Sequence, residues 1–532
     1  MRVGIIVGFL SHHRRGHHLR GVVQPQVGPL IAALLPSDVE VEVINETWKE
    51  PDWSRHYDLL FLSGLHPDFD KVRQISHYWR LRGTKTVYGG ILPSTYPEMC
   101  EPFFDAVVIG DPESTVPRIF EDFVAGRLQK VYISGPYDPN SVPIPRIDLI
   151  ADQQVIPLAM EATRGCPFLC EFCALTGLGT RFHTRPPELI VRDVKAGQRM
   201  LRGRVPWYKL KWASFFDNNI GGHLPWLKEF CAAMKPLGIK WGAAATFNVV
   251  ANLDIVKHLS AGGCRYLFVG LESFSQESLT DMNKVQNAIE NTREVLDQCR
   301  EHGILICSGL MLNPMVDTRE SMLAIPRHLH ECGLHVPSFI SFESPIPGTP
   351  HFYRLAAQED PAILPNAYLR DFTGYTLVTK PQRETVDTFI DTFKTLIRVI
   401  YSRRSRMRKL VDDLPRFMRH GYWIPALSDL FDMVDATWDL DLRRTFVAGT
   451  DAEPPNAYVT PLSGSDFKSD SERRAVMEPA LVSGPRGEVL PQWLRSQRVF
   501  DKHGQIAIQP SPKFVNPIAP PLPQPPSASA SL

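Results

Sequence analysis

Three cysteines in one short loop constrain this chain more than any other feature of its sequence. Cys166, Cys170 and Cys173 stand in a CxxxCxxC spacing, directly after an apolar run at 155–160. A cube of four irons needs soft thiolate ligands, and this spacing lets one loop wrap three corners while the fourth iron stays open to another ligand. The alternatives are a zinc loop, for which His183 is the candidate fourth ligand, and three unrelated buried thiols.

The residues around these cysteines closely resemble those of the radical S-adenosylmethionine enzymes. They read Thr163-Arg-Gly-Cys166-Pro, and the aromatic Phe172 stands immediately before the last cysteine. The resemblance implies that the three cysteines hold a [4Fe–4S] cluster whose open iron binds the amino and carboxylate groups of S-adenosylmethionine. It further implies that one electron cleaves the sulfonium to methionine and a 5′-deoxyadenosyl radical, which takes hydrogen from the substrate, and that Phe172 lies near the adenine.

The composition favours a cytoplasmic protein of more than one domain. The chain has 532 residues, of which 43% are hydrophobic, so packed cores are expected. Lys plus Arg and Asp plus Glu both number 58, which favours a small molecule or a protein over nucleic acid as the partner. The first residues lack a signal-peptide pattern, no apolar run reaches membrane-spanning length, and the scattered cysteines outside the loop fit reduced thiols.

Residues 1–140 alternate short strands and helices, the pattern of a parallel sheet covered on both faces. Strands are predicted at 2–9, 39–44, 58–63, 84–88 and 105–109, and helices at 27–35, 69–82 and 116–128. Three strand ends carry small residues, namely Ser63, Gly64, Gly89, Gly90 and Gly110. Glycine at such ends lets a flat or bulky cofactor approach the backbone, although each glycine taken alone is better explained by a tight turn.

This first segment resembles the N-terminal cobalamin-binding domain of one class of radical enzymes. The resemblance is carried by Gly89-Gly90, by the strand end Val107-Val-Ile-Gly110-Asp-Pro-Glu113 and by the linker Val142-Pro-Ile-Pro-Arg146. It implies a Rossmann-like domain that binds cobalamin at the small residues of the three strand ends. The Asp-x-His-x-x-Gly signature of some cobalamin proteins is absent, so we predict no protein histidine as the lower ligand of cobalt.

Residues 141–360 continue the alternation of strand and helix. Strands are predicted at 155–160, 211–216, 240–247, 265–269, 304–312 and 338–342, and helices at 226–234, 253–261, 287–301 and 319–332. Six such units predict a partial (β/α)₆ TIM-type barrel, whose working face is the carboxyl end of its strands.

Polar residues follow two of these strands. The second strand runs into Phe215-Phe-Asp217, where a simple turn is the alternative reading, and the fourth into Gly270-Leu-Glu272-Ser273. The family resemblance implies that Asp217 approaches the amino group of S-adenosylmethionine, although the Gly-Gly-Glu form of the family is absent there. It also implies that Gly270 and Glu272 line the S-adenosylmethionine pocket.

The remainder of the chain is predicted to be helical and then irregular. Residues 361–450 read as a helical C-terminal cap, and 451–532 as an irregular extension with a disordered Pro-rich tail.

The resemblance implies an enzyme that transfers a methyl group from cobalamin to an unactivated carbon of a small-molecule substrate, with an electron donor such as flavodoxin or ferredoxin. A cobalamin-dependent radical cyclase or oxidase would carry the same motifs, and a non-catalytic iron–sulfur or cobalamin sensor is the alternative outside enzymes. A methylthiotransferase fits less well, because the N-terminal segment has only Cys100 where that relative has three cysteine ligands.

Overall fold

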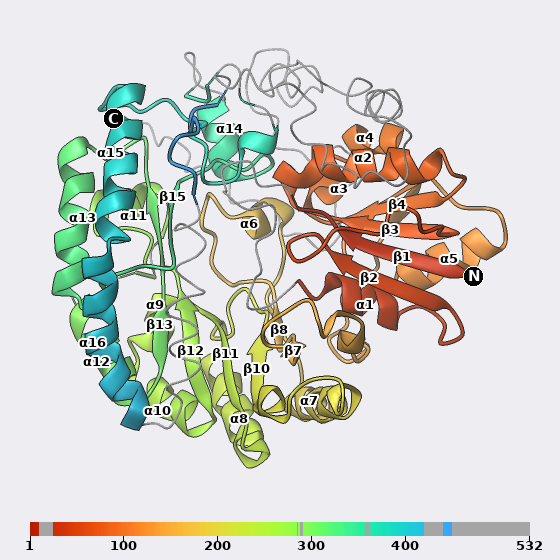
Figure 1. The fold of residues 1–532 in the computed structure, drawn as a ribbon, viewed down its shortest axis with the longest axis horizontal. Coiled ribbons are helices and arrows are strands. Elements are labelled where there is room, and N and C mark those ends of the chain that lie inside the picture. Colours follow the sequence, from red (N-terminus) through yellow and green to blue (C-terminus); the bar gives the residue numbers. More distant parts are fainter. Residues whose placement is uncertain are drawn as a thin grey trace, which may run out of the picture.

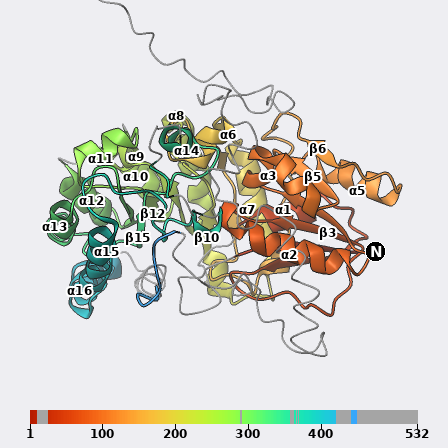
Figure 2. The ribbon, with the colours of Figure 1, turned by 90° about the horizontal axis from the view of Figure 1, so that it is seen from above.

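The computed structural model describes residues 1–9, 25–284, 286–287, 291–356, 362–364, 367, 369–419 and 440–448. Over these residues the chain forms two α/β units, each built on a parallel sheet (Figure 1). Figure 2 shows the N-terminal sheet and its helices beside the strands and helices that follow. The predicted extension at 451–532 lies outside the described residues.

The N-terminal sheet has, within the described residues, six parallel strands in the order β2-β1-β3-β4-β5-β6. The strands are β1 (Arg2–Val7), β2 (Glu40–Asn45), β3 (Leu59–Ser63), β4 (Lys85–Gly89), β5 (Ala106–Ile109) and β6 (Val131–Ile133). The helices are α1 (Val27–Ala33), α2 (Phe69–Arg80), α3 (Ile91–Thr95), α4 (Pro97–Cys100) and α5 (Val116–Val124).

Helices cover both faces of this sheet. Ile31 of α1 and Ile119 of α5 belong to the core on one face, whereas Val72 and Ile75 of α2 belong to the core on the other. The chain crosses from one side of β1 to the other between β2 and β3, and ligands of such sheets bind beyond the carboxyl ends of the strands near that point.

The second unit contains, in its described part, a five-stranded parallel sheet in the order β13-β12-β11-β10-β7 and a parallel pair β14-β15. The strands are β7 (Ala159–Met160), β10 (Trp212–Phe215), β11 (Lys240–Ala245), β12 (Cys264–Val269), β13 (Leu305–Cys307), β14 (Gly309–Leu312) and β15 (Phe339–Phe342). A short antiparallel ribbon, β8 (Thr163–Arg164) with β9 (His183–Thr184), follows β7. A bridge between Glu272 and Leu310 links the segment after β12 to β14.

Helices alternate with these strands and pack on them around one large core. They are α6 (Ala174–Leu178), α7 (Pro187–Leu201), α8 (Leu224–Met234), α9 (Phe247–Val250), α10 (Leu253–Ala261), α11 (Gln276–Asp281), α12 (Thr292–Glu301) and α13 (Arg319–Glu331). Several begin at a side-chain cap: Asn252, Ser275 and Thr318 accept hydrogen bonds from backbone N–H groups of the first turns of α10, α11 and α13. These caps satisfy donors that the helix leaves unpaired, which fixes where each helix starts.

The helices after the last strand are α14 (Pro350–Ala356), α15 (Val386–Ile400) and α16 (Arg403–Arg419). Phe389, Phe393 and Ile397 of α15 are buried in the core of the second unit. In the predicted cap region, the described helices α15 and α16 therefore lie alongside α13 and α12, as Figure 1 shows.

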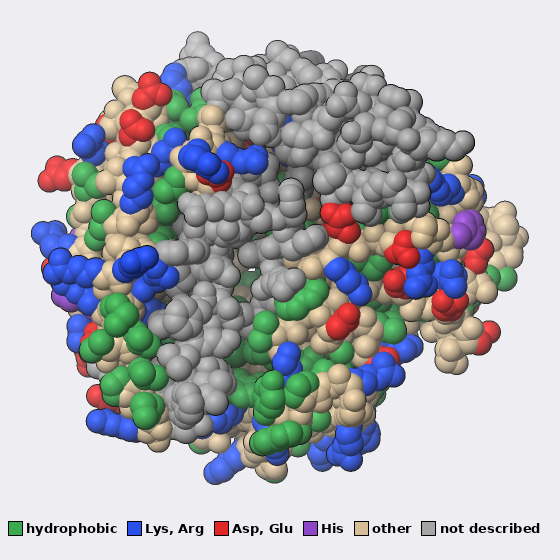
Figure 3. All heavy atoms as spheres, viewed as in Figure 1, with side chains coloured by type: hydrophobic (Ala, Val, Ile, Leu, Met, Phe, Trp, Pro, Cys, Tyr) green, Lys and Arg blue, Asp and Glu red, His purple; other side chains and the backbone are tan. Residues whose placement is uncertain are grey.

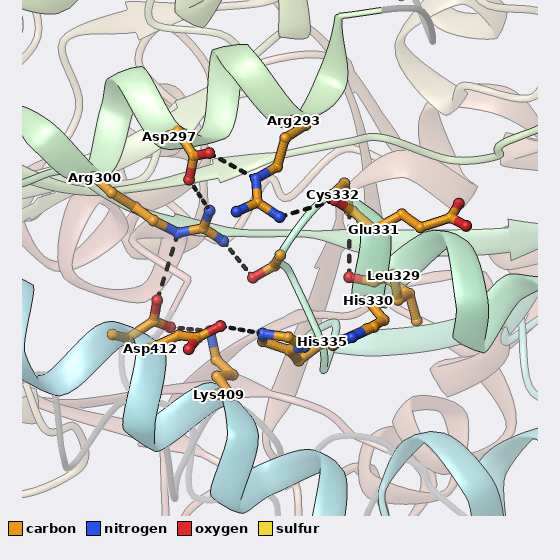
Figure 4. A network of polar contacts seen from close by, with 12 residues as sticks. Arg293, Asp297, Arg300, Leu329, His330, Glu331, Cys332, His335, Lys409 and Asp412 are labelled. Atoms are coloured by element: carbon orange, nitrogen blue, oxygen red, sulfur yellow. Dashed lines mark hydrogen bonds and ion pairs between the residues drawn. The ribbon is translucent and has the colours of Figure 1, made fainter.

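A polar network holds α16 to this layer (Figure 4). His335 Nε2 lies 2.6 Å from the Asp412 carboxylate, and Arg300 of α12 lies 3.5 Å from the Asp413 carboxylate. Arg300 also donates to Asp297 of its own helix at 2.9 Å. The apolar face of α15 and the ionic partners of α16 together fix the C-terminal helices.

Segments beyond β15 also reach the N-terminal sheet. Phe352 and Phe372 are buried in the same core as Tyr88 of β4. The hydroxyl of Tyr353 lies 2.9 Å from the hydroxyl of Tyr96, which follows α3. The two units are therefore joined by apolar packing and by hydrogen bonds.

The observed elements agree with most predicted ones, and the differences have local causes. The strand predicted at 304–312 is two strands interrupted at Ser308, because β13 pairs with β12 whereas β14 pairs with β15. The strand predicted at 155–160 covers only Ala159–Met160, and β6 was not predicted because three residues give no alternating pattern.

None of the described helices is both long and apolar enough to cross a bilayer. On the face of the molecule in Figure 3, basic and acidic side chains both occur, as the balanced composition predicts.

Candidate active site

The cysteine loop joins the β8–β9 ribbon to α6. Gly165 has φ +81°, and a Cβ there would lie 2.1 Å from the carbonyl oxygen of Arg181, so only glycine fits this turn. Within the loop, the backbone N–H of Cys173 donates to the carbonyl oxygen of Cys170 at 3.1 Å. Cys170 is buried and Cys166 and Cys173 are half-buried, so the loop holds its sulfurs at the edge of the core.

Two amides from other parts of the chain donate to these sulfurs. Asn219 Nδ2 lies 3.7 Å from Cys166 Sγ, and Gln286 Nε2 lies 3.5 Å from Cys170 Sγ. Burial raises the pKa of Cys166 and of Cys173, and the charge of Cys170 raises both further. In the metal-free protein these shifts favour the protonated thiols of Cys166 and Cys173.

The predicted alternative of a zinc loop has no fourth ligand at His183 in this structure. Among the described residues, no group of three or more His, Cys, Asp and Glu side chains is arranged to hold one metal ion. A cube distributes its cysteines over different irons, so their sulfurs lie farther apart than the ligands of one ion. The ring of His183 packs against Tyr137, 5.2 Å between centroids, and supplies no such group.

Asp217 supports the strand that leads into the cysteine loop. It lies two residues beyond β10, where its Oδ1 accepts the backbone N–H groups of Ala162 at 2.8 Å and Thr163 at 3.0 Å. Its Oδ2 is buried and has no hydrogen-bond partner among the described residues. Burial raises the pKa of Asp217 to about 8. Oδ1 therefore positions the loop. Oδ2 is the oxygen with which a ligand cation would pair.

Glu272 follows β12 and forms an isolated bridge with Leu310 of β14. Its φ is +64°, a conformation that side chains rarely adopt, and the backbone N–H of Met311 donates to its carbonyl oxygen at 2.7 Å. Its carboxylate lies 2.5 Å from Lys284 Nζ, and both side chains are nearly buried. A Cβ at Gly270 would lie 2.1 Å from Glu272 Oε1, so the glycine makes room for this carboxylate.

Phe172 brings the cysteine loop next to this ion pair. Lys284 Nζ lies 5.7 Å from the centroid of the Phe172 ring, a cation–π distance. The predicted residues Phe172, Gly270 and Glu272 are therefore brought together. Asp217 instead contacts the backbone at Ala162 and Thr163, which precede the cysteine loop.

The other predicted residues share the carboxyl edge of the N-terminal sheet. Ser63 and Gly64 end β3, Gly89 and Gly90 end β4, and Gly110 follows β5, three neighbouring strands. Gly90 has φ +131° and Gly110 has φ +89°. The Ser94 hydroxyl donates to the Gly90 carbonyl at 2.7 Å and accepts the Gly110 N–H at 3.0 Å. This edge offers backbone and small side chains.

Arg164 connects this edge to the cysteine loop. Its guanidinium contacts Glu161 at 2.7 Å, Glu113 at 2.8 Å and Asp111 at 3.3 Å, and it lies over the ring of Tyr137 at 4.1 Å from the centroid. Asp111 and Glu113 directly follow Gly110, and Arg164 stands two residues before Cys166. We call Arg164 with its three carboxylates the Arg164 clamp.

Sequence reasoning missed several residues of this region. Arg164 served only to mark a motif, and its acidic partners lie up to 53 positions away in the chain. The sequence offers no reason to assign a role to Lys284, Gln286 or Asn219. The sequence signal for these residues was the short polar run that follows each strand. Such runs place polar groups at one edge of the sheet, but they do not show which of these groups contact one another.

Comparisons with known proteins give two kinds of similarity; no family model matches the chain. The bacteriochlorophyllide d C-8(2)-methyltransferase of Chlorobaculum tepidum is 24% identical over 343 residues, 61% of this chain and 75% of the relative. The C-12(1)-methyltransferase of the same organism is 25% identical over 334 residues, 61% of this chain and 72% of the relative. An anaerobic magnesium-protoporphyrin IX monomethyl ester cyclase of Synechocystis sp. is 22% identical over 255 residues, 42% of this chain and 49% of the relative.

Two solved structures share the fold. The cobalamin-dependent S-adenosylmethionine radical enzyme OxsB, with aqua-cobalamin and S-adenosylmethionine bound, has a TM-score of 0.56 at 13% identity and covers 91% of this chain and 84% of its own. The radical S-adenosylmethionine methyltransferase TsrM from Kitasatospora setae, with cobalamin and a [4Fe-4S] cluster bound, has a TM-score of 0.52 at 16% identity and covers 90% of this chain and 99% of its own. At these identities the likeness is one of fold.

Proposed function

We propose that this chain, a relative of the cobalamin-dependent radical S-adenosylmethionine enzymes in sequence and in fold, is a methyltransferase that acts on an unactivated carbon of a small molecule. In this proposal the second unit is the partial (β/α)₆ barrel, and the N-terminal unit is the cobalamin-binding domain. The relatives at 24% and 25% identity are methyltransferases of bacteriochlorophyllides, which supports methyl transfer without naming the substrate here.

The proposed cofactor contacts follow from the donor chemistry of each edge. Cys166, Cys170 and Cys173 would hold a [4Fe–4S] cluster, because they are soft donors on one loop. Asp217 Oδ2, which is buried without a partner among the described residues, suits the ammonium group of S-adenosylmethionine. Glu272 suits a hydroxyl or ammonium of the same molecule.

The cobalamin contacts would come from the backbone. Glycine at the ends of β4 and β5 lets a flat macrocycle lie against the sheet edge, where a side chain would hold it away. When bound, these groups would supply a 5′-deoxyadenosyl radical and a transferable methyl group. The residues described here would bind and orient them, and the buried surroundings would keep water away from the radical.

The observation that supports this assignment most is the Arg164 clamp. One guanidinium joins the residues after Gly110 to the residues before Cys166, so the two proposed cofactor sites are linked by one partly buried side chain. A cofactor on one edge and a substrate on the other must meet for methyl transfer, and such a link would fix their separation.

The test is anaerobic reconstitution of the full chain with iron, sulfide and hydroxocobalamin, followed by iron, corrinoid and nucleoside analysis. With S-adenosylmethionine and a low-potential donor such as reduced flavodoxin or ferredoxin, we expect 5′-deoxyadenosine. Cys166→Ala should abolish it, whereas Cys332→Ala, a buried cysteine outside the loop, should not. Absence of 5′-deoxyadenosine from the iron-loaded wild type would contradict the proposal and favour a sensor.

The cyclase among the relatives makes ring closure or oxidation the second candidate. Product mass separates the two once a substrate is found, since transfer adds a methyl group and cyclisation does not. Deuterated S-methyl label in the product would support transfer, and an unlabelled product would support cyclisation.

A further inference from the structure

Two amide side chains from outside the cysteine loop donate to its sulfurs, and a lysine lies beside Phe172 of the loop. Asn219 follows β10 and donates to Cys166 Sγ at 3.7 Å, and Gln286 lies beyond α11 and donates to Cys170 Sγ at 3.5 Å. Lys284, two residues before Gln286, lies 5.7 Å from the ring of Phe172. We call Asn219, Lys284 and Gln286 the sulfur collar.

The charge in the collar belongs to a nearly buried lysine. Lys284 pairs with Glu272 at 2.5 Å, and only 8% of its surface is exposed. Burial disfavours its charged form, but the paired carboxylate of Glu272 raises its pKa overall. The ammonium thus stays charged next to the cysteines, where the low dielectric strengthens its field.

Hydrogen-bond donors and a cation beside a cluster shift its reduction potential in a predictable direction. Reduction adds one electron and no proton to the cluster, so its negative charge grows by one unit. Hydrogen bonds to the sulfurs and a nearby cation stabilise the more negative state, which raises the reduction potential. The negative charge of Glu272 offsets part of this rise in potential. However, Glu272 also keeps Lys284 protonated, because an unpaired buried lysine would lose its proton.

We propose that the sulfur collar makes the cluster easier to reduce, with Lys284 as its main contributor and Gln286 as a smaller one. The collar residues are not ligands; they act through the three cysteines. This inference rests on the proposed cluster. The electron comes from a low-potential one-electron donor, which is oxidised by one electron as the cluster is reduced.

The test is a redox titration of the reconstituted full chain, followed by the electron paramagnetic resonance signal of the reduced cluster. At a fixed solution potential, Lys284→Met should lower the ratio of reduced to oxidised cluster about tenfold, equivalent to about 59 mV for one electron. Gln286→Leu should lower it about threefold. Lys284→Arg, which keeps the charge, should restore most of the wild-type ratio.

Lys240→Met is the matched control. Lys240 is also a partly buried lysine beside an aromatic ring, that of Trp212 at 5.5 Å, but it stands at the amino end of β11. It should leave the ratio unchanged. An unchanged ratio in Lys284→Met would overturn the inference, and so would loss of the cluster from both Lys284→Met and Gln286→Leu, which would make the collar a structural support. A wild type that binds no iron would instead overturn the proposed function.

Discussion

The carboxyl edges of the two sheets differ in the groups that they present. The N-terminal edge consists of Ser63 and of glycines such as Gly90 and Gly110, with backbone N–H and carbonyl groups between them. The edge of the second unit presents three thiols and the ionisable side chains Asp217, Glu272 and Lys284. Both edges belong to parallel sheets of similar construction, so the fold alone does not explain the difference.

In the proposed function, one architecture serves two kinds of recognition. The glycine edge would admit a large flat ligand to the backbone, whereas the edge with ionisable side chains would bind small polar groups and a metal cluster. The Arg164 clamp is the point where the two edges are coupled by charge.

Breaking the clamp should give the largest effect. Arg164→Met leaves Asp111, Glu113 and Glu161 facing one another without a cation. Removing one partner of a buried ion pair costs about 3–5 kcal/mol, so in this partly buried cluster we expect a loss of about 2–3 kcal/mol. Urea unfolding of the metal-free protein measures this loss. Arg127→Met removes an exposed arginine from Asp122 and should cost less than about 1 kcal/mol. Equal losses of unfolding free energy in the two variants would show that the Arg164 clamp stabilises the fold no more than an exposed ion pair does.

The next largest effect tests whether the two sheet edges bind their proposed cofactors independently. A Cβ at Gly89 would touch only Val108, at 3.5 Å, so the fold should accept Gly89→Leu. The added side chain would raise the Kd for hydroxocobalamin about tenfold, about 1.4 kcal/mol, while the iron content stays unchanged. Equilibrium dialysis and iron analysis check both. Gly135→Leu after β6 serves as the control, and a parallel loss of iron in Gly89→Leu would contradict separate sites.

A smaller effect concerns the pH dependence of Asp217. Its pKa is raised by burial to about 8 in the folded protein and is about 4 when unfolded, so the folded state holds the extra proton between these values. Stability should therefore fall as pH rises from about 4 to 8. Asp217→Asn keeps an oxygen for the N–H groups of Ala162 and Thr163 and should remove this decline.

Urea unfolding at pH 5 and pH 8 checks this prediction. The Asp217→Asn protein should gain at least about 1 kcal/mol on the wild type at pH 8, and little at pH 5. Asp254→Asn, at an exposed carboxylate, should show no such change between the two pH values. A wild type that is more stable than Asp217→Asn at pH 8 would contradict the buried, raised pKa.

The smallest effect lies in the network of Figure 4, remote from the cysteine loop in sequence. Burial lowers the pKa of His335 below its ordinary value near 6.5, although Asp412 opposes this. The folded state resists protonation, so stability should decrease as pH falls below about 6.5. His335→Asn tolerates the positive φ of this position and should flatten the decrease by less than about 1 kcal/mol, with iron content unchanged. A change in iron content would link this network to the site.

The sequence predicted most strands of both sheets because buried parallel strands read as short apolar runs with turn residues between them. It did not predict the break at Ser308, since the residues on both sides of it are apolar and only their pairing partners differ. The C-terminal helices were predicted, but their contacts with α12 and α13 depend on which apolar faces meet.

By itself, the sequence determined the local features of this protein: three cysteines at loop spacing, glycines at strand ends and polar runs after apolar ones. These are properties of neighbours in the chain, and local chemistry decides them. Only the tertiary structure decided which polar groups meet, such as Arg164 with Glu113 or Lys284 with Phe172. The reason is physical: a buried charge is tolerated only beside its partner, and the packing of distant segments chooses that partner.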